Sequence, residues 1–159
     1  MKKKVLISAV SAVSTISVLT IVLCISIAAY LCAPRKVKRY FLFSLDNISE
    51  VRVVVPYHVE SDEFPGVEVE KNKEYVLKDS DELIKDLSNV VVTPIIFKTK
   101  SFYEERCYVY FEYNNKEYCI STTYISKENK YGYRCFYYHY SKEIYSIVMN
   151  YLEENGVTN

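Results

Sequence analysis

The sequence predicts an α+β protein: an N-terminal transmembrane helix, then a small antiparallel sheet, a meander, with two helices on one face. Three features predict it: an uncharged apolar run, two alternating strand patterns that meet at Asn114-Asn115, and two short amphipathic helical patterns. About 120 residues follow the apolar run, enough for one domain with one core. We divide the chain into an anchor (1–34), a basic juxtamembrane stem (35–47) and a Tyr-rich domain (48–155).

The expected anchor runs from Val5 to Ala33 without a charged residue. As a helix it would be roughly 43 Å long, which exceeds a hydrocarbon core of roughly 30 Å, so it can span with tilt. A secreted protein with a cleaved signal is the alternative, because Lys2–Lys4 form an n-region and Ser26-Ile27-Ala28 offers small residues for cleavage. The run is longer than the roughly 7–15 residues of a signal h-region, which favours an uncleaved, single-pass signal-anchor.

Topology and self-association are the open points of this anchor. The N-terminal lysines favour a cytoplasmic start and an extracytoplasmic domain, whereas the basic residues from Arg35 to Arg39 favour the reverse. Ser8 and Ala12, like Ser11 and Thr15, are four apart, a spacing that lets two helices approach closely. A homo-oligomer formed through this helix is therefore a second interpretation, in which the protein is a membrane assembly subunit.

The first part of the domain contains one strand and a long polar stretch. Val51–Val55 is β-branched, and we expect Pro56 to end it. Residues 60–86 are rich in acidic side chains and contain the turn sequence Phe64-Pro65-Gly66, which predicts a solvated acidic loop.

A short helix and an edge strand are expected next. Asp79 and Glu82 have the spacing of a capping box, and Leu83, Ile84 and Leu87 follow on one helical face. Residues 90–97 then form an apolar run interrupted by Pro94, which is typical of an edge or bulged strand.

The clearest pattern is a β-hairpin in residues 106–124. Asn114-Asn115 tolerates the positive φ of a type I′ turn, and such a turn pairs Phe111 with Tyr118 and Glu112 with Glu117. This register gives one apolar face, made of Cys107, Val109, Phe111, Tyr118 and Ile120. The opposite face then carries Tyr108, Tyr110, Ser121 and Thr123.

An aromatic strand and a helix complete the domain. The strand is expected in residues 131–140, and the helix begins after the cap Ser141. Its apolar residues recur at helical spacing, and Gly156 fits just beyond its end.

Composition argues against most chemical functions. Twenty Lys and Arg balance twenty Asp and Glu, so the chain lacks the basic footprint of a nucleic-acid-binding protein. His58 and His139 do not have metal-site spacing with Cys or acidic residues, and we expect no metal or other cofactor. Cys107, Cys119 and Cys135 are interpreted as small apolar strand residues, and the absence of a nucleophile, base and oxyanion-hole signature indicates a protein that is not an enzyme.

What remains unusual is a concentration of tyrosine. Thirteen of the seventeen tyrosines lie between Phe102 and Tyr151. Helices can cover one face of the sheet only, so we expect Tyr108, Tyr110 and Tyr138 to be exposed beside Arg134. Tyrosine with arginine is typical of recognition surfaces, which predicts a binding surface for a protein or cell-envelope ligand.

The hairpin sequence FEYNNKEYCI, followed by an aromatic strand and SKEIYSIVMNYL, resembles uncharacterised small extracytoplasmic domains of bacterial lipoproteins and membrane-anchored proteins. The resemblance covers residues 48–154 and is a pattern of elements. It implies an exported α+β domain and supplies no site residues.

Overall fold

The computed structural model describes residues 2–45, 48, 50–95, 105–129 and 132–157, and it describes side chains except in 2–15, 128–129 and 132–138. The chain divides into two compact units, Met1–Ala33 and Pro34–Asn159. The first unit contains one helix, α1 (Lys2–Cys32).

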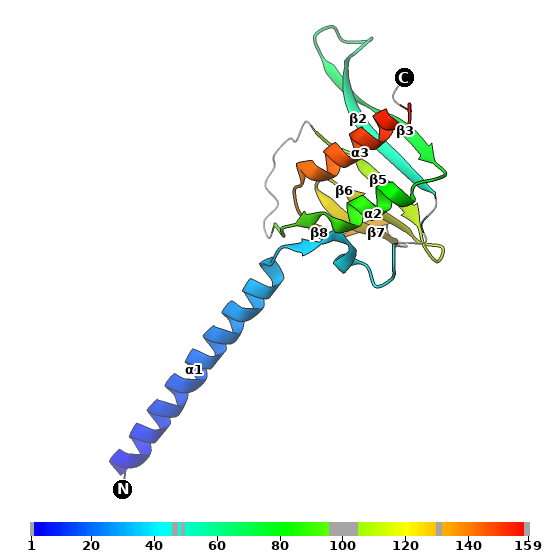
Figure 1. The fold of residues 1–159 in the computed structure, drawn as a ribbon. Helices are drawn as coiled ribbons and strands as arrows, with labels where there is room; N and C mark the ends of the chain where they lie inside the picture. Colours follow the sequence, from blue (N-terminus) through cyan, green and yellow to red (C-terminus); the bar gives the residue numbers. More distant parts are fainter. Residues whose placement is uncertain (1, 46–47, 49, 96–104, 130–131, 158–159) are drawn as a thin grey trace. The chain divides into compact units, whose positions relative to one another are not determined.

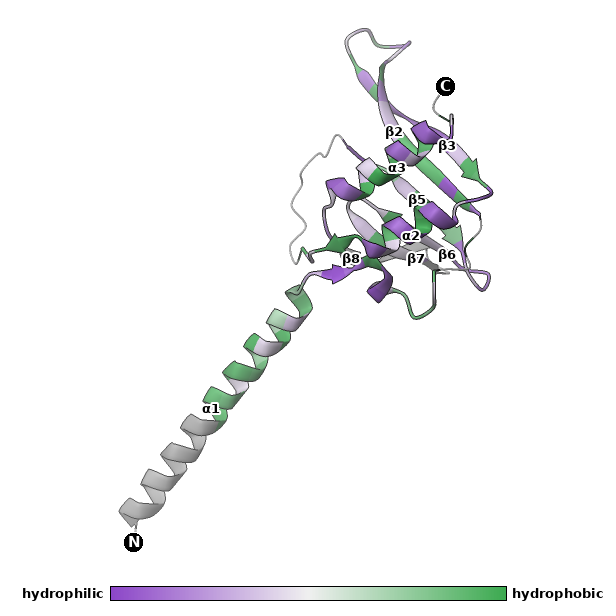
Figure 2. Cartoon of the chain, in the orientation of Figure 1, coloured by the Kyte–Doolittle hydropathy of each residue, from purple (hydrophilic) through white to green (hydrophobic). Residues whose placement is uncertain are grey.

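The described part of α1 is apolar on every side. Its large side chains are exposed, and most of its described residues are hydrophobic (Figure 2). Thr20 and Ser26 donate hydrogen bonds to the carbonyl oxygens of Ile16 and Val22, one helical turn earlier. Within the part of the chain that the structure describes, no helix has the length and hydropathy needed to cross a membrane.

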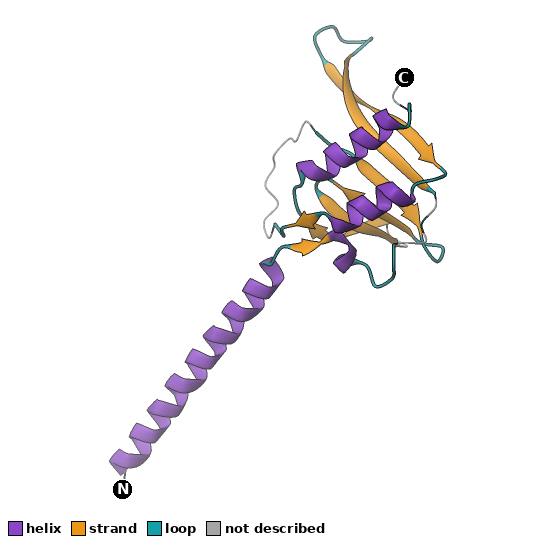
Figure 3. Ribbon diagram, in the orientation of Figure 1, coloured by secondary structure: helices purple, strands orange, loops and turns teal. Residues whose placement is uncertain are grey.

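The second unit is α+β, and its described strands form two antiparallel sheets (Figure 3). The larger sheet has the order β3-β2-β5-β6-β7-β8, which is a meander from β5 to β8. Its strands are β2 (Val51–Glu60), β3 (Glu68–Leu77), β5 (Tyr108–Glu112), β6 (Glu117–Ser121), β7 (Tyr124–Asn129) and β8 (Gly132–Tyr138). The smaller sheet pairs β1 (Arg35–Lys36) with β4 (Val91–Val92).

Helices α2 (Asp81–Asn89) and α3 (Lys142–Glu154) lie side by side on one face of the large sheet (Figure 1). We call this the inner face and the opposite one the outer face. The core lies between helices and sheet. It includes Leu83, Ile84 and Leu87 of α2, Ile144, Val148 and Leu152 of α3, and Val51, Val53, Val109, Phe111 and Ile120 of the strands. The expected antiparallel sheet with two helices on one face is thus confirmed.

The β5–β6 hairpin has the register predicted from the sequence. Phe111 pairs with Tyr118 and Glu112 with Glu117. Asn114 and Asn115 have φ values of 51° and 57°, as a type I′ turn requires. All five residues of the predicted apolar face are buried: Cys107, Val109, Phe111, Tyr118 and Ile120.

The two expected helices are present, and only the start of α2 differs from the prediction, by one residue. Ser80, rather than Asp79, precedes α2, and its carbonyl accepts the hydrogen bond from the Ile84 amide at 2.9 Å. Ser141 precedes α3 as predicted. Gly156 (φ 64°) follows α3, where its amide and that of Val157 bond back to Glu153 and Leu152 in a Schellman motif.

The β2–β3 hairpin corrects two predictions. Pro56 does not end the first strand, because β2 continues to Glu60 and Pro56 pairs with Asn72. Beyond Val54, β2 is paired with β3 but no longer with β5, and a proline is tolerated in a strand with one neighbour. The acidic stretch from Glu68 is likewise strand β3, not loop, although the turn at Gly66 is correct.

Other elements differ in length or were missed. The apolar run from Val90 gives the two-residue strand β4, and the remainder of that prediction beyond residue 95 lies outside the described residues. Strand β7 was not predicted, because its polar sequence YISKEN has weak alternation. The segment 35–45 contains β1 and the 3-10 helix η1 (Val37–Tyr40) and belongs to the same unit as the sheet.

Candidate binding surface

The outer face carries a group of tyrosines that we call the tyrosine cluster: Tyr108, Tyr110 and Tyr124. The ring of Tyr108 lies 6.4 Å from that of Tyr110 and 5.9 Å from that of Tyr124, measured between centroids. All three side chains are half-buried. They adjoin the small residues of β6 and β7: Tyr110 pairs with Cys119, and Tyr108 pairs with Ser121.

The tyrosine rings can lie on the outer face because the side chains beneath them are small. Cys119, Ser121 and Ser126 are fully buried although α2 and α3 cover the other face. Tyr110 also forms a hydrogen bond with the Cys119 thiol that lowers the pKa of that thiol slightly against the larger effect of burial. The rings therefore shield the small side chains and keep their own outer surfaces accessible.

Arg52 joins the cluster from β2. Its neighbours Val51 and Val53 are buried on the inner face, so the alternation of the strand turns Arg52 to the outer face. Its guanidinium carbon lies 4.3 Å from the centre of the Tyr110 ring, a cation–π geometry.

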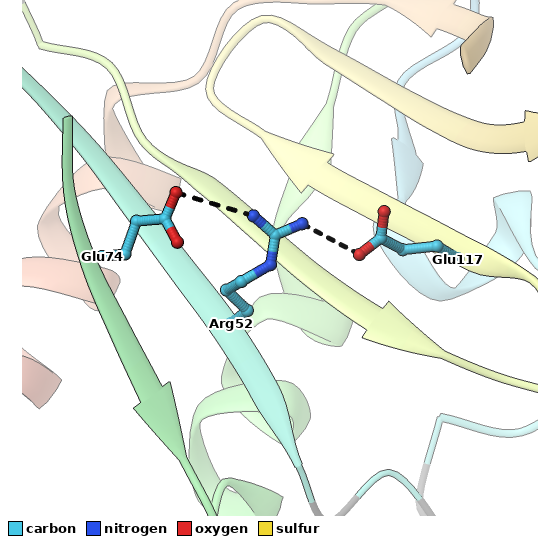
Figure 4. Close-up of polar contacts among 3 residues, drawn as sticks. All are labelled: Arg52, Glu74 and Glu117. Carbon is cyan, nitrogen blue, oxygen red and sulfur yellow. Dashed lines mark hydrogen bonds and ion pairs between the residues drawn. The ribbon is translucent and has the colours of Figure 1, made fainter. Parts of the chain in front are cut away.

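Two carboxylates hold the guanidinium in this position (Figure 4). Arg52 donates a hydrogen bond to Glu117 at 2.9 Å and forms a longer ion pair with Glu74 at 3.9 Å. The hydrogen bond with Glu117 raises the pKa of Arg52. Because Glu74 is on β3 and Glu117 on β6, Arg52 links four neighbouring strands at a partly exposed site.

The tyrosine hydroxyls are neutral at physiological pH. Burial raises the pKa of Tyr110 to about 12, and it also raises the pKa of Tyr108 and Tyr124. A hydrogen bond between Tyr110 and Tyr124 adds to the increase for Tyr124. The cluster therefore offers aromatic faces and neutral hydroxyl groups, and it has no phenolate nucleophile.

An open pocket of about 410 Å³ adjoins Tyr110. Its polar lining consists of Arg52, Tyr110, Glu50, Glu112 and Glu117. Its apolar lining comes from Ile48, Val51, Val76 and Phe111, which connect it to the edge of the core. Such a mixed, concave surface can accept a side chain or a ring from a ligand.

Two of the four predicted binding residues lie in this site. Tyr108 and Tyr110 are neighbours on the outer face, as predicted, but their side chains are half-buried and not exposed as expected. The side chains of Arg134 and Tyr138 lie outside the described residues, and their backbones pair with Lys127 and Tyr124.

The sequence interpretation missed Arg52, Glu117 and Tyr124. The sequence pattern could have placed Arg52, because strand alternation in the run VRVVV turns this arginine to the face opposite Val51 and Val53. The partners of Arg52 could not be found in this way, since they depend on which strands become neighbours.

The two described cysteines of the sheet, Cys107 and Cys119, are protected from reaction by burial. Cys107 and Cys119 are free and fully buried. Burial raises the pKa of Cys107 to about 12 and also raises that of Cys119, so both remain thiols near neutral pH. Cys135 has its side chain outside the described residues, and among the described side chains no group of His, Cys, Asp and Glu is arranged to hold a metal ion.

His139 lies in the interior of the domain, directly after β8. It is fully buried, and its Nε2–H donates to the carbonyl oxygen of Ser121 at 2.9 Å. Burial lowers its pKa to about 4, so the ring is neutral at physiological pH. His139 therefore has a structural role, because its hydrogen bond connects the residue after β8 to the last residue of β6.

Comparisons with family models, with curated proteins and with solved structures gave no match for this chain.

Proposed function

We propose that this protein is a single-pass, membrane-anchored and non-enzymatic interaction module that presents its outer sheet face to an extracytoplasmic protein or cell-envelope ligand. The anchor is supported by the uncharged run from Val5 to Ala33. A helix that is apolar on every side is suited to lipid, where Thr20 and Ser26 have their hydroxyl groups satisfied by the helix itself.

The observation that carries the proposed interaction is the accessible stack of Arg52 on Tyr110. Tyrosine and arginine are enriched among the residues that carry most of the binding energy of protein interfaces, and a tyrosine ring buries much area with little loss of conformational entropy. Here Glu74 and Glu117 fix the guanidinium, so little further ordering is needed on binding. The adjoining pocket gives the surface a concave part that a ligand can fill.

Membrane topology is tested first, in intact cells that express the full chain with a C-terminal tag. An impermeant biotin reagent or protease should modify or remove the tag while the anchor remains in the membrane fraction. A tag that is protected until lysis would contradict the extracytoplasmic placement. It would mean that the basic residues after Ala33 have set the topology.

The interaction is tested by photo-crosslinking. A benzoylphenylalanine in place of Tyr110 should form an adduct in cells, and the same group in place of Lys85, exposed on α2, is the matched control. The additional change Arg52→Ala should weaken the Tyr110 adduct, because it removes the stacked cation. Equal adducts from both positions, or none from Tyr110, would contradict binding at the outer face.

A further inference from the structure

The segment that follows the proposed anchor is built into the domain. Val37, Phe41 and Leu45 are buried in the core. The Val37 amide donates a hydrogen bond to the Val90 carbonyl oxygen at 2.9 Å, next to the β1–β4 pairing. Residues 35–45 therefore move with the folded domain and do not act as a loose tether.

The exposed residues beside and between these buried positions form what we call the basic loop: Lys36, Lys38, Arg39 and Leu42. All four are exposed, and Leu42 has the largest exposed fraction of any large apolar side chain in the described residues. No ion pair within the described part of the chain involves Lys38 or Arg39. The loop thus combines uncompensated positive charge with a fully exposed leucine.

Chain connectivity limits how far this loop can lie from the end of the anchor. Each residue extends the chain by at most about 3.5 Å, so Lys36 lies within about 10 Å of Ala33. Residues 37–40 form a compact turn that adds little to this reach. The headgroup layer on each side of the hydrocarbon core is roughly 5–8 Å thick, so the chain allows the basic loop to lie at headgroup level.

We infer that the domain docks on an anionic phospholipid surface through the basic loop. The three cations lie against lipid phosphates, and Leu42 enters the boundary between headgroups and acyl chains. The inference rests on the proposed membrane anchor. Because the loop is part of the core, this contact holds the whole domain against the membrane.

The chain contains no tryptophan, so one introduced tryptophan is a unique fluorescent probe. Leu42→Trp is placed in the full chain, which is reconstituted in phosphatidylcholine nanodiscs with or without one-third phosphatidylglycerol. Phe64→Trp, exposed in the β2–β3 turn, is the matched control. Emission wavelength and quenching by brominated lipid report lipid contact, and acrylamide quenching reports water contact.

With phosphatidylglycerol, Leu42→Trp should emit at shorter wavelength than Phe64→Trp, and brominated lipid should quench it. Adding Lys38→Gln and Arg39→Gln should lower the ratio of docked to undocked domain by roughly thirty-fold, about five-fold per charge. Equal acrylamide quenching of the two probes, or equal docking in pure phosphatidylcholine, would overturn the inference.

Retention of the chain in membranes washed with alkaline carbonate separates this result from the proposed anchor. A chain that is retained but has a water-exposed Trp at position 42 contradicts docking alone. A chain that is released contradicts the anchor itself.

Discussion

The two hairpins of the large sheet, β5–β6 and β2–β3, are stabilised by different interactions. The short β5–β6 hairpin has its inner face in the core and its outer face under the tyrosine cluster. The longer β2–β3 hairpin extends past its neighbours (Figure 1), and every residue from Glu68 to Glu74 is exposed. Burial thus stabilises one hairpin, whereas cross-strand pairing and its attachment to the sheet maintain the other.

The largest expected difference between the two hairpins is the loss of unfolding free energy when an aromatic side chain is replaced by alanine. Phe111 is 2 % exposed and lies 5.6 Å from the Phe41 ring and 5.7 Å from the Tyr118 ring. Phe111→Ala should lower the free energy of unfolding by about 3–5 kcal/mol. Tyr57→Ala, in the exposed part of β2, should change it by less than about 0.5 kcal/mol. Urea unfolding measures both, and similar losses would contradict the comparison.

Acid should weaken the end of the sheet where His139 bonds to the Ser121 carbonyl oxygen. The folded pKa of His139, about 4, is below the unfolded value, so the unfolded state binds more protons between pH 6.5 and 4. The contribution of the neutral ring to the free energy of unfolding is fully present above pH 6.5. It decreases as the pH falls, and the free energy of unfolding should be about 2 kcal/mol lower at pH 5. Urea unfolding at pH 7.5 and pH 5 measures this, and His139→Gln should flatten the difference.

The turns of the two hairpins should respond differently to alanine. Asn115→Ala places alanine at a φ of 57° and should lower global stability by about 1–2 kcal/mol, whereas Asn115→Gly should preserve it. Gly66→Ala, at a φ of 80°, meets no atom within 4 Å. Because the β2–β3 turn lies far from the core, its strain should increase local proteolysis without changing the urea midpoint. A shifted midpoint for Gly66→Ala would show that the hairpin unfolds with the domain.

The smallest expected effect concerns a like-charge pair. Glu112 is directly opposite Glu117, and Glu117 already bonds to Arg52. Glu112→Gln should raise the free energy of unfolding by about 0.2–0.5 kcal/mol at low salt, and the gain should shrink as salt increases. A loss of stability would mean that Glu112 contributes to holding Arg52.

The same contrast explains what the sequence could predict. The β5–β6 register followed from strict alternation and from a turn that only a few residues tolerate. Helices α2 and α3 followed from apolar residues at helical spacing. Strand β3 was missed because its charged residues alternate without an apolar face, which protects an exposed sheet edge but removes the signal.

The candidate site was predictable to a smaller extent. Tyr108 and Tyr110 were placed correctly because they share a strand whose inner face was evident. Tyr124 was missed because strand β7 was not predicted. Arg52 comes from a strand that joins the hairpin only through a non-local pairing: β2 pairs with β5 across more than fifty residues of sequence, as the Arg52–Tyr110 pairing shows. Single-strand periodicity cannot give such non-local pairings.

The packing of residues 35–45 also limits how the domain could be shed by a protease. A cut between Val37 and Leu45 would leave β1 and part of η1 bound through the β1–β4 pairing and the Val37–Val90 hydrogen bond. A fragment beginning at residue 48 would lack Val37, Phe41 and Leu45 and would expose the core that they fill. Release of an intact domain therefore requires cleavage before Pro34, where the two compact units meet.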